Sequence, residues 1–579
     1  MTIDPKDLRT LLVRVTLVTL AVRAVPLLSS DLVPGEVAAA MGLGAEGLST
    51  EPLAQLSRAW LHAAGGMGLM ARLPALLADL LLPMLAVVFA RASGWGAIPG
   101  LMAALLLAIA PLGIEAGFRA DGGALPAALA LGALFLLQKG LTTNDLRRIA
   151  LSAVVLLLGG VLLPPLLLLV PVGLGLAALA LAERRVKRTA LISWLFAPLL
   201  AIAGRELLLG HLLPEATRAE HWLSLARLSG EGGAWSTVAA LPAALQALAT
   251  MGPAGPQGEL AAQLQMPTAP LWTVLLALAL AGLAAAGVLL GRVQADPTAP
   301  TQVPVSEEPG AGAVDGWRTL GVGGALTVPR ALGLRDWLPL LLGVVFAAAD
   351  VGMAAQRSDP SALFARLAIG RVCLALLLGV GITAWAMPRS GGTPSEVVRR
   401  KRRFNLSMAA SASAIFALGA MHLMAWTRSV DPLAPRRVAQ FARDHMEQGG
   451  ALLTLGPRGL PVAFLLDPLA NQQRVRVASL EPADAKAHLA MLLRQGPQVV
   501  VLAGDRDALG ETGTQVKQQT ELLRLAAALR GMLEASGYHA VEDGHAFLGQ
   551  TAVAAFTRVA ADVPDPGVVR PQLGPGLAP

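Results

Sequence analysis

The stretch from Arg72 to Leu137 reads RLPALLADLLLPMLAVVFARASGWGAIPGLMAALLLAIAPLGIEAGFRADGGALPAALALGALFLL. It holds three apolar runs, Leu73–Ala90, Ala97–Ile114 and Ala124–Leu137, separated by short segments that carry charge or glycine. A helix needs about 20 mostly apolar residues to cross the hydrocarbon core of a bilayer. The stretch therefore predicts consecutive membrane-spanning helices.

The same pattern recurs along most of the chain. Of its 579 residues, 54% are hydrophobic and 15% are charged, whereas a soluble protein carries about a quarter charged residues. The candidate spans are Leu11–Leu28, Leu73–Ala90, Ala97–Ile114, Ala124–Leu137, Ile149–Leu163, Leu166–Leu181, Ala190–Leu209, Leu271–Leu290, Trp337–Ala354, Leu363–Met387 and Leu406–Trp426. We predict an α-helical polytopic membrane protein with about eleven transmembrane helices.

Basic residues gather in short segments beside these runs. Lys6 and Arg9 precede the first run, Arg184–Arg188 lies between the sixth and seventh, and Arg399–Arg403 precedes the last. Positively charged loops stay on the cytoplasmic side. We therefore predict a bacterial inner-membrane protein with a cytoplasmic N-terminus and a periplasmic C-terminal domain. Topology accounts for the net charge of +7, so no nucleic-acid partner is expected.

Composition also divides the chain into regions. Short apolar runs at Ala451–Leu455 and Val499–Leu502, a helical pattern at Gln518–Glu534 and a candidate strand at Thr551–Thr557 predict a small α/β domain. The predicted regions are an N-terminal membrane module at 1–291 with periplasmic loops at 29–72 and 210–270, a flexible cytoplasmic linker at 292–336, C-terminal transmembrane helices at 337–426, a periplasmic α/β domain at 427–562 and a disordered tail at 563–579.

Carboxylates in the first predicted loop are candidates for chemistry. Asp31 and Glu36 follow the first helix, where a carboxylate near the membrane surface can act as a general base or hold a divalent metal. The alternative is that they only keep the loop soluble. The single cysteine, Cys373, excludes a disulfide within the chain, and no G-x-x-x-x-G-K-[ST] nucleotide loop is present.

A second group of charges lies at the predicted junction between the third and fourth helices. Glu115, Arg119 and Asp121 fall near bilayer depth, where charged groups need partners or a function. The planar guanidinium of Arg119 suits a phosphate, and Asp121 is placed to orient it; the alternative is an ion pair that ends two helices. Arg72, at the start of the second helix, either faces the same site or snorkels to lipid headgroups.

The order of these segments resembles a known family. Arg72-Leu73-Pro74 opens a helix, Ala110-Pro111 closes the next, and Arg119-Ala120-Asp121 forms the following junction. This is similar to the GT-C superfamily of polyprenyl-phosphate-sugar glycosyltransferases, in particular the protein O-mannosyltransferases and the aminoarabinose transferases of lipid A, with their RLPS start, SP end and R-x-D junction. Glu51–Leu56 is similar to the family's PPLYYWL segment. The likeness covers roughly residues 11–209.

This resemblance implies a GT-C-like fold and a membrane-embedded glycosyltransferase. Its partners would be a polyprenyl-phosphate-linked sugar, membrane lipid and a periplasmic acceptor. The phosphate would lie near Arg119 or Arg72, with Glu115 as a further substrate-binding candidate. Glu36 or Asp31 would deprotonate the acceptor, with Asp121 as a further catalytic candidate, and the sugar would transfer with inversion.

One departure keeps the identity of the base open. Gly35-Glu36 stands where the family has Asp-Glu. No cofactor is required by the sequence, and a divalent metal is left open. Two alternatives remain: a catalytically degenerate GT-C-fold protein that serves envelope assembly or lipid binding, and a lipid or solute transporter. The transporter hypothesis depends on charges within helices, of which Asp79 and Asp350 are the main candidates.

Overall fold

A computed structural model of the chain forms two compact units, Met1–Val430 and Asp431–Pro579. We call them the helical unit and the C-terminal unit. The structure describes residues 5–30, 32, 36–37, 40, 43–44, 47–48, 52–65, 68–120, 123–162, 164–182, 192, 194, 196, 199–200, 203–204, 207, 248, 271–290, 334–356, 363–386, 394–429, 434–446, 450–455, 459–466, 475–478, 482–505, 527–548 and 551–558.

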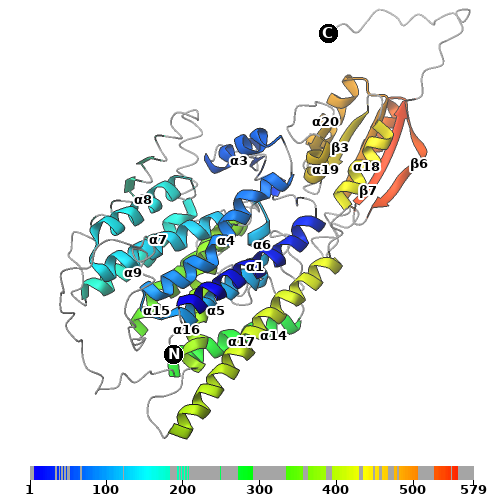
Figure 1. Ribbon diagram of the computed structural model, residues 1–579. Helices are drawn as coiled ribbons and strands as arrows, with labels where there is room; N and C mark the ends of the chain where they lie inside the picture. Colours follow the sequence, from blue (N-terminus) through cyan, green and yellow to red (C-terminus); the bar gives the residue numbers. More distant parts are fainter. Residues whose placement is uncertain are drawn as a thin grey trace, which may run out of the picture. The chain divides into compact units, whose positions relative to one another are not determined.

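The helical unit is built from long apolar helices that pack side by side (Figure 1). Its helices are α1 (Pro5–Ser29), α3 (Pro52–Ala63), α4 (Gly68–Ala92), α5 (Ala97–Ile109), α6 (Pro111–Phe118), α7 (Ala124–Thr143), α8 (Leu146–Leu162), the 3-10 helix η1 (Pro164–Leu168), α9 (Leu169–Ala182), α14 (Leu271–Leu290), α15 (Leu334–Gln356), α16 (Leu363–Ala386) and α17 (Pro394–Ser429). Two antiparallel strands of two residues each, β1 (Leu43–Gly44) and β2 (Gly47–Leu48), lie between α1 and α3 in the sequence.

Five of the described helices are long and apolar enough to cross a membrane, and a sixth span results if α5 and α6 count as one. Three shorter apolar helices accompany them, within α9, α14 and α15. The chain is thus an α-helical polytopic membrane protein, but the predicted number of eleven helices is not confirmed. The predicted span at Ala190–Leu209 lies largely outside the described residues.

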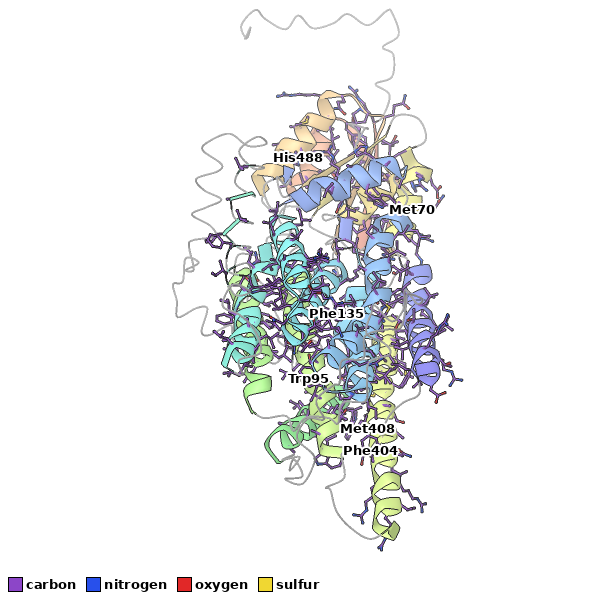
Figure 2. All side chains as sticks on the ribbon, turned by 60° about the vertical axis from the view of Figure 1, so that its left-hand side comes forward. Met70, Trp95, Phe135, Phe404, Met408 and His488 are labelled. Atoms are coloured by element: carbon purple, nitrogen blue, oxygen red, sulfur yellow. The ribbon has the colours of Figure 1, made fainter. Side chains whose placement is uncertain are left out.

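The outer surface of the helices is apolar, as a lipid-facing surface requires. In α4, Leu77 and Leu81 are 56% and 52% exposed, whereas Ala78 and Leu82 on the opposite side are buried. Among the aromatic side chains, Trp95 is buried in the core of the bundle and Phe135 is partly buried against it (Figure 2). Small residues allow close helix contacts: a Cβ on Gly287 of α14 would lie 1.9 Å from the carbonyl oxygen of Gly381 in α16.

The predicted single helix at Ala97–Ile114 is wrong. The structure ends α5 at Ile109, gives Ala110 an extended ψ of 150° and starts α6 at Pro111, with a bend of 64° between the two helices. Proline has no N–H to donate to the preceding turn, and its ring restricts the residue before it to extended conformations. The break leaves carbonyl groups without helical partners inside the bundle.

Proline also ends α8, because that helix stops at Leu162 and the 3-10 helix begins at Pro164. This break falls between the predicted spans Ile149–Leu163 and Leu166–Leu181. The predicted linker at 292–336 lies outside the described residues up to 333, and α15 already begins at Leu334. The predicted tail at 563–579 also lies outside them.

The C-terminal unit is a three-layer α/β structure. Its elements are α18 (Ala434–Met446), β3 (Ala451–Leu455), α19 (Gly459–Leu466), β4 (Val475–Ala478), α20 (Pro482–Arg494), β5 (Val499–Asp505), β6 (Tyr538–Leu548) and β7 (Thr551–Arg558). The sheet order is β4-β3-β5-β7-β6, with β4, β3 and β5 parallel and β7 antiparallel to both of its neighbours.

Alternation along β5 shows how this sheet is covered on both faces. Val500 and Leu502 pack with Leu489 of α20, whereas Val501 and Ala503 pack with Val438 of α18. Successive strand residues point to opposite faces, so a strand covered on both sides is apolar throughout. The small α/β domain expected from the sequence is present, and its strands β3 and β5 fall where the apolar runs predicted them.

Candidate functional site

Glu36 and Arg72 form a buried ion pair at the start of α4. Arg72 Nε donates to Glu36 Oε1 at 2.7 Å and Arg72 Nη2 donates to Glu36 Oε2 at 2.6 Å, a two-pronged contact between planar groups. The side chains are 3% and 0% exposed. Arg72 Nη1 also donates to the carbonyl and hydroxyl of Ser30. The snorkelling interpretation of Arg72 is therefore wrong, because its guanidinium is buried against the protein.

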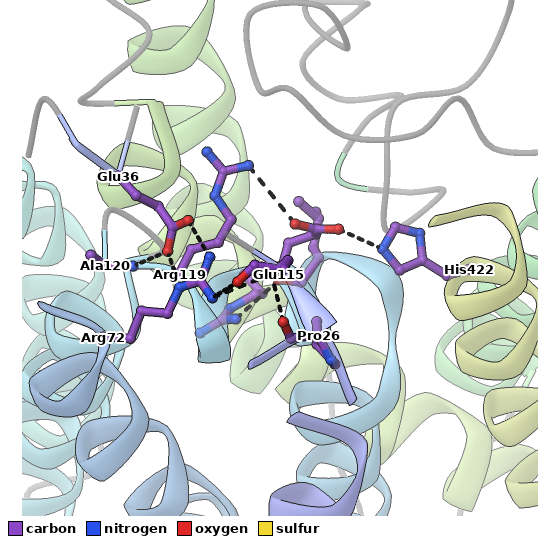
Figure 3. A network of polar contacts seen from close by, with 10 residues as sticks. Pro26, Glu36, Arg72, Glu115, Arg119, Ala120 and His422 are labelled. Carbon is purple, nitrogen blue, oxygen red and sulfur yellow. Dashed lines mark hydrogen bonds and ion pairs between the residues drawn. The ribbon is translucent and has the colours of Figure 1, made fainter. Parts of the chain in front are cut away.

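The Glu36 carboxylate also reaches the junction after α6. The backbone N–H of Ala120 donates to Glu36 Oε1 at 2.9 Å. The ring of Phe118 lies 5.3 Å from the Arg72 guanidinium carbon, within cation–π range. Residues from the first loop, the start of α4 and the R-x-D junction thus meet at one place (Figure 3).

Glu115 connects this place to α17. Glu115 Oε2 lies 3.8 Å from Nη1 of Arg119, one turn further along, and Glu115 Oε1 lies 2.9 Å from Nε2 of His422. All three side chains are at most 4% exposed. The edge of the Trp426 ring approaches Phe118, which adds a second contact between α6 and α17. We call Glu36, Arg72, Glu115, Arg119 and His422 the junction cluster.

A second buried cluster holds the break between α5 and α6. Arg23 of α1 pairs with Asp79 of α4 through Nε at 3.1 Å and Nη2 at 3.0 Å. Arg23 also donates to the carbonyls of Ala108 and Gly113, the latter at 2.8 Å. Ala108 lies in the last turn of α5, where carbonyls lack helical partners and need such a donor when no water reaches them.

Arg371 of α16 completes this set by donating from Nη1 to the carbonyl of Leu112 at 3.2 Å. We call Arg23, Asp79 and Arg371 the break cluster. Gly117 of α6 packs directly on it, because a Cβ there would lie 2.2 Å from Arg23 Nε and 2.4 Å from Asp79 Oδ2. Only glycine lets α6 lie this close to the ion pair.

The structure thus brings together four of the six predicted site residues, Glu36, Arg72, Glu115 and Arg119. The other two, Asp31 and Asp121, lie outside the described residues. Their catalytic and binding roles stay predictions. Among the described residues, no group of three His, Cys, Asp or Glu side chains is placed to hold a metal ion.

Sequence reasoning missed His422, Arg23 and Arg371. Each is a polar residue within an apolar span, which is the signal that singled out Asp79 and Asp350. Both of those acids are paired in the structure, Asp79 with Arg23 and Asp350 with Arg366 at 2.5 Å.

Two chemical properties follow from this arrangement. The junction and break clusters together hold four arginines and three carboxylates, so with His422 neutral they carry one excess positive charge. Such an excess suits an anionic group. Glu36 already accepts three hydrogen bonds, whereas a carboxylate offers about four acceptor positions.

Comparison with known proteins gives a likeness in structure only. No protein-family model and no curated protein sequence matches the chain. A crystal structure of ArnT from Cupriavidus metallidurans bound to undecaprenyl phosphate is similar over 95% of this chain and 98% of that chain, with 14% identity and a TM-score of 0.51.

Two further structures are similar at TM-scores below 0.5. The arabinofuranosyltransferase AftD from Mycobacteria is 16% identical over 97% of this chain and 40% of that chain, with a TM-score of 0.43. An oligosaccharyltransferase from Archaeoglobus fulgidus is 11% identical over 96% of this chain and 75% of that chain, also at 0.43. At these identities the likeness concerns the fold alone. In its fold, this chain is similar to ArnT.

Proposed function

We propose that the chain is a membrane glycosyltransferase that moves a sugar from a polyprenyl-phosphate donor to an acceptor on the periplasmic side. The observation that carries this proposal is the junction cluster, in which Glu36, Arg72 and Arg119 meet within a GT-C fold. The guanidinium group of Arg119 in this cluster supports an anionic donor. The ArnT structure of similar fold contains undecaprenyl phosphate, which supports a polyprenyl-linked lipid as partner.

In the proposed reaction, a carboxylate takes a proton from the acceptor hydroxyl or amine. The acceptor atom then attacks the anomeric carbon, and the bond between that carbon and the phosphate oxygen breaks. The polyprenyl phosphate leaves with its new charge beside fixed guanidinium groups, Arg119 first among them. The attack from the opposite face inverts the anomeric configuration.

The three hydrogen bonds to Glu36 bear on which carboxylate is the base. A base needs a free lone pair directed at the acceptor, and Glu36 has most of its positions taken by Arg72 and Ala120. We infer that Glu36 fixes Arg72 and the R-x-D junction in place, and that Asp31 or Asp121 removes the proton.

The test is transfer of label from radiolabelled polyprenyl-phosphate sugars in membranes. Wild type is compared with Asp31→Asn, Asp121→Asn and Glu36→Gln at matched expression. Loss of the general base is expected to lower the rate by about 10²–10⁴-fold. A fall of this size in Asp31→Asn or Asp121→Asn that leaves the unfolding temperature unchanged identifies the base. Equal transfer by wild type and all three variants would contradict the proposal.

A second candidate function is a non-catalytic GT-C-fold protein that binds lipid. Two observations favour it, namely Gly35 in place of the family's aspartate and the three hydrogen bonds that Glu36 accepts from Arg72 and Ala120. This candidate predicts that wild type binds undecaprenyl phosphate but transfers no label from any donor in a panel. The transporter hypothesis has less support, because Asp79 and Asp350 are both paired with arginines.

A further inference from the structure

The buried residues Arg23, Arg72 and Arg371 differ in what the Nε and Nη2 atoms of their guanidinium groups contact. Nε and Nη2 form the edge that binds a carboxylate in two-pronged fashion. Arg72 directs this edge at Glu36, and Arg23 directs it at Asp79. Arg371 is 7% exposed, yet neither its Nε nor its Nη2 has a hydrogen-bond partner among the described residues.

The free edge belongs to a guanidinium that lines a cavity. Arg371 lies in its wall together with Leu112, Gly113 and Leu248, and the remaining lining residues are apolar side chains of α5 and α16. The cavity lies at the break between α5 and α6, next to the carbonyl that Arg371 Nη1 contacts. The Nε and Nη2 groups of Arg371 and its formal charge therefore face a cavity whose described lining residues include no acceptor side chain.

The break cluster has one more positive than negative charge. Arg23 and Arg371 contribute two positive charges and Asp79 one negative charge, and Asp79 is hydrogen-bonded to Arg23. Arg371 is therefore the excess cation, in a segment that is long and apolar enough to span a membrane. A buried charge of this kind is costly unless it is paired and hydrogen-bonded. Water would satisfy the N–H groups but would leave the charge uncompensated.

The cavity volume decides the size of the ligand. It is about 20 Å³, and on this measure a cavity of roughly 10–15 Å³ holds one water molecule. A monatomic halide is close to water in size, whereas a tetrahedral oxyanion such as phosphate, with five heavy atoms, is larger. We propose that the Arg371 cavity binds one small monovalent anion of the halide type, of which chloride is the physiological representative.

The bound anion would take the position that a carboxylate holds beside Arg72 and Arg23. It would accept hydrogen bonds from Nε and Nη2 of Arg371 and neutralise the break cluster. Because Arg371 also holds the Leu112 carbonyl, the anion would fix α16 against the bend between α5 and α6. This site is independent of the proposed glycosyl transfer, and its test needs no activity.

The experiment follows the unfolding temperature of the purified full-length protein in detergent while sodium gluconate is replaced by sodium chloride at constant ionic strength. Chloride and bromide are expected to raise the unfolding temperature by roughly 2–4 °C near saturation. Inorganic phosphate at the same ionic strength is expected to have no such effect, because it is too large for the cavity. Bromide also allows direct placement by anomalous diffraction.

Three variants locate the effect. Arg371→Met removes the charge, and Ala375→Leu fills the cavity that Ala375 lines while keeping the arginine. Both are expected to lose the halide response, and Ala375→Leu carries the test if Arg371→Met does not fold. Arg366→Met is the matched control in the same helix and is expected to keep the response, since Arg366 pairs with Asp350.

Three outcomes would overturn the proposal. The first is a wild type that unfolds at the same temperature in chloride and gluconate, which would leave water as the occupant. The second is an unchanged halide response in both Arg371→Met and Ala375→Leu, which would place the anion elsewhere. The third is a shift with phosphate but not with halide.

Discussion

The junction cluster and the break cluster use the same kinds of residue for different tasks. In the junction cluster, side chains bind side chains: Glu36 holds Arg72, and Glu115 lies between Arg119 and His422. In the break cluster, Arg23 and Arg371 also bind backbone carbonyls on the two sides of the break between α5 and α6. The comparison shows that a charge in a membrane span can serve the backbone as well as a substrate. Charge alone therefore does not mark a catalytic residue.

The largest expected effect lies in the break cluster. Arg23→Leu would leave Asp79 buried without its partner and remove donors from the carbonyls of Ala108 and Gly113. Removal of one member of a buried ion pair typically costs about 3–5 kcal/mol. We expect a loss of this size in the free energy of unfolding, measured in detergent by thermal or denaturant unfolding. Arg14→Leu, at an exposed position of the same helix, is the control and should cost far less.

A smaller effect is expected where α6 touches the break cluster. Gly117→Ala would force a Cβ into the space of Arg23 Nε and Asp79 Oδ2, and overpacking of this kind costs about 1–3 kcal/mol. Gly132→Ala is the matched substitution in α7, where a Cβ meets nothing within 4 Å. Unfolding temperatures that fall equally in the two variants would show that α6 is not held against the ion pair.

The smallest effect should appear in the junction cluster. His422→Leu removes one hydrogen bond from Glu115 but leaves Arg119 in place, so the fold should persist. We expect label transfer to fall roughly tenfold, which corresponds to about 1.4 kcal/mol in transition-state energy. His422→Gln keeps a donor and should retain most of the rate. Equal rates in His422→Leu and wild type would show that His422 of α17 does not contribute to transfer.

Part of the fold and part of the site could be predicted from sequence. Apolar runs placed α4, α7, α16 and the strands β3 and β5, because hydropathy and periodicity are local properties of the chain. The motif order around Arg72 and Arg119 pointed to the GT-C fold. The number of membrane spans was not settled in this way, and the helix break at Pro111 was missed because the apolar run continues through it.

Sequence by itself determined that this is a membrane protein with an α/β C-terminal unit. It also identified Glu36, Arg72, Glu115 and Arg119 as candidate site residues. Only the tertiary structure decided which charges meet. Glu36 lies 36 residues from Arg72, Arg23 lies 56 residues from Asp79, and Glu115 lies 307 residues from His422. Such pairs depend on how whole helices pack, and on which edge of each guanidinium faces a carboxylate. No local pattern encodes that arrangement, because a single charged residue in an apolar run looks the same whether it binds a side chain, a carbonyl or a ligand.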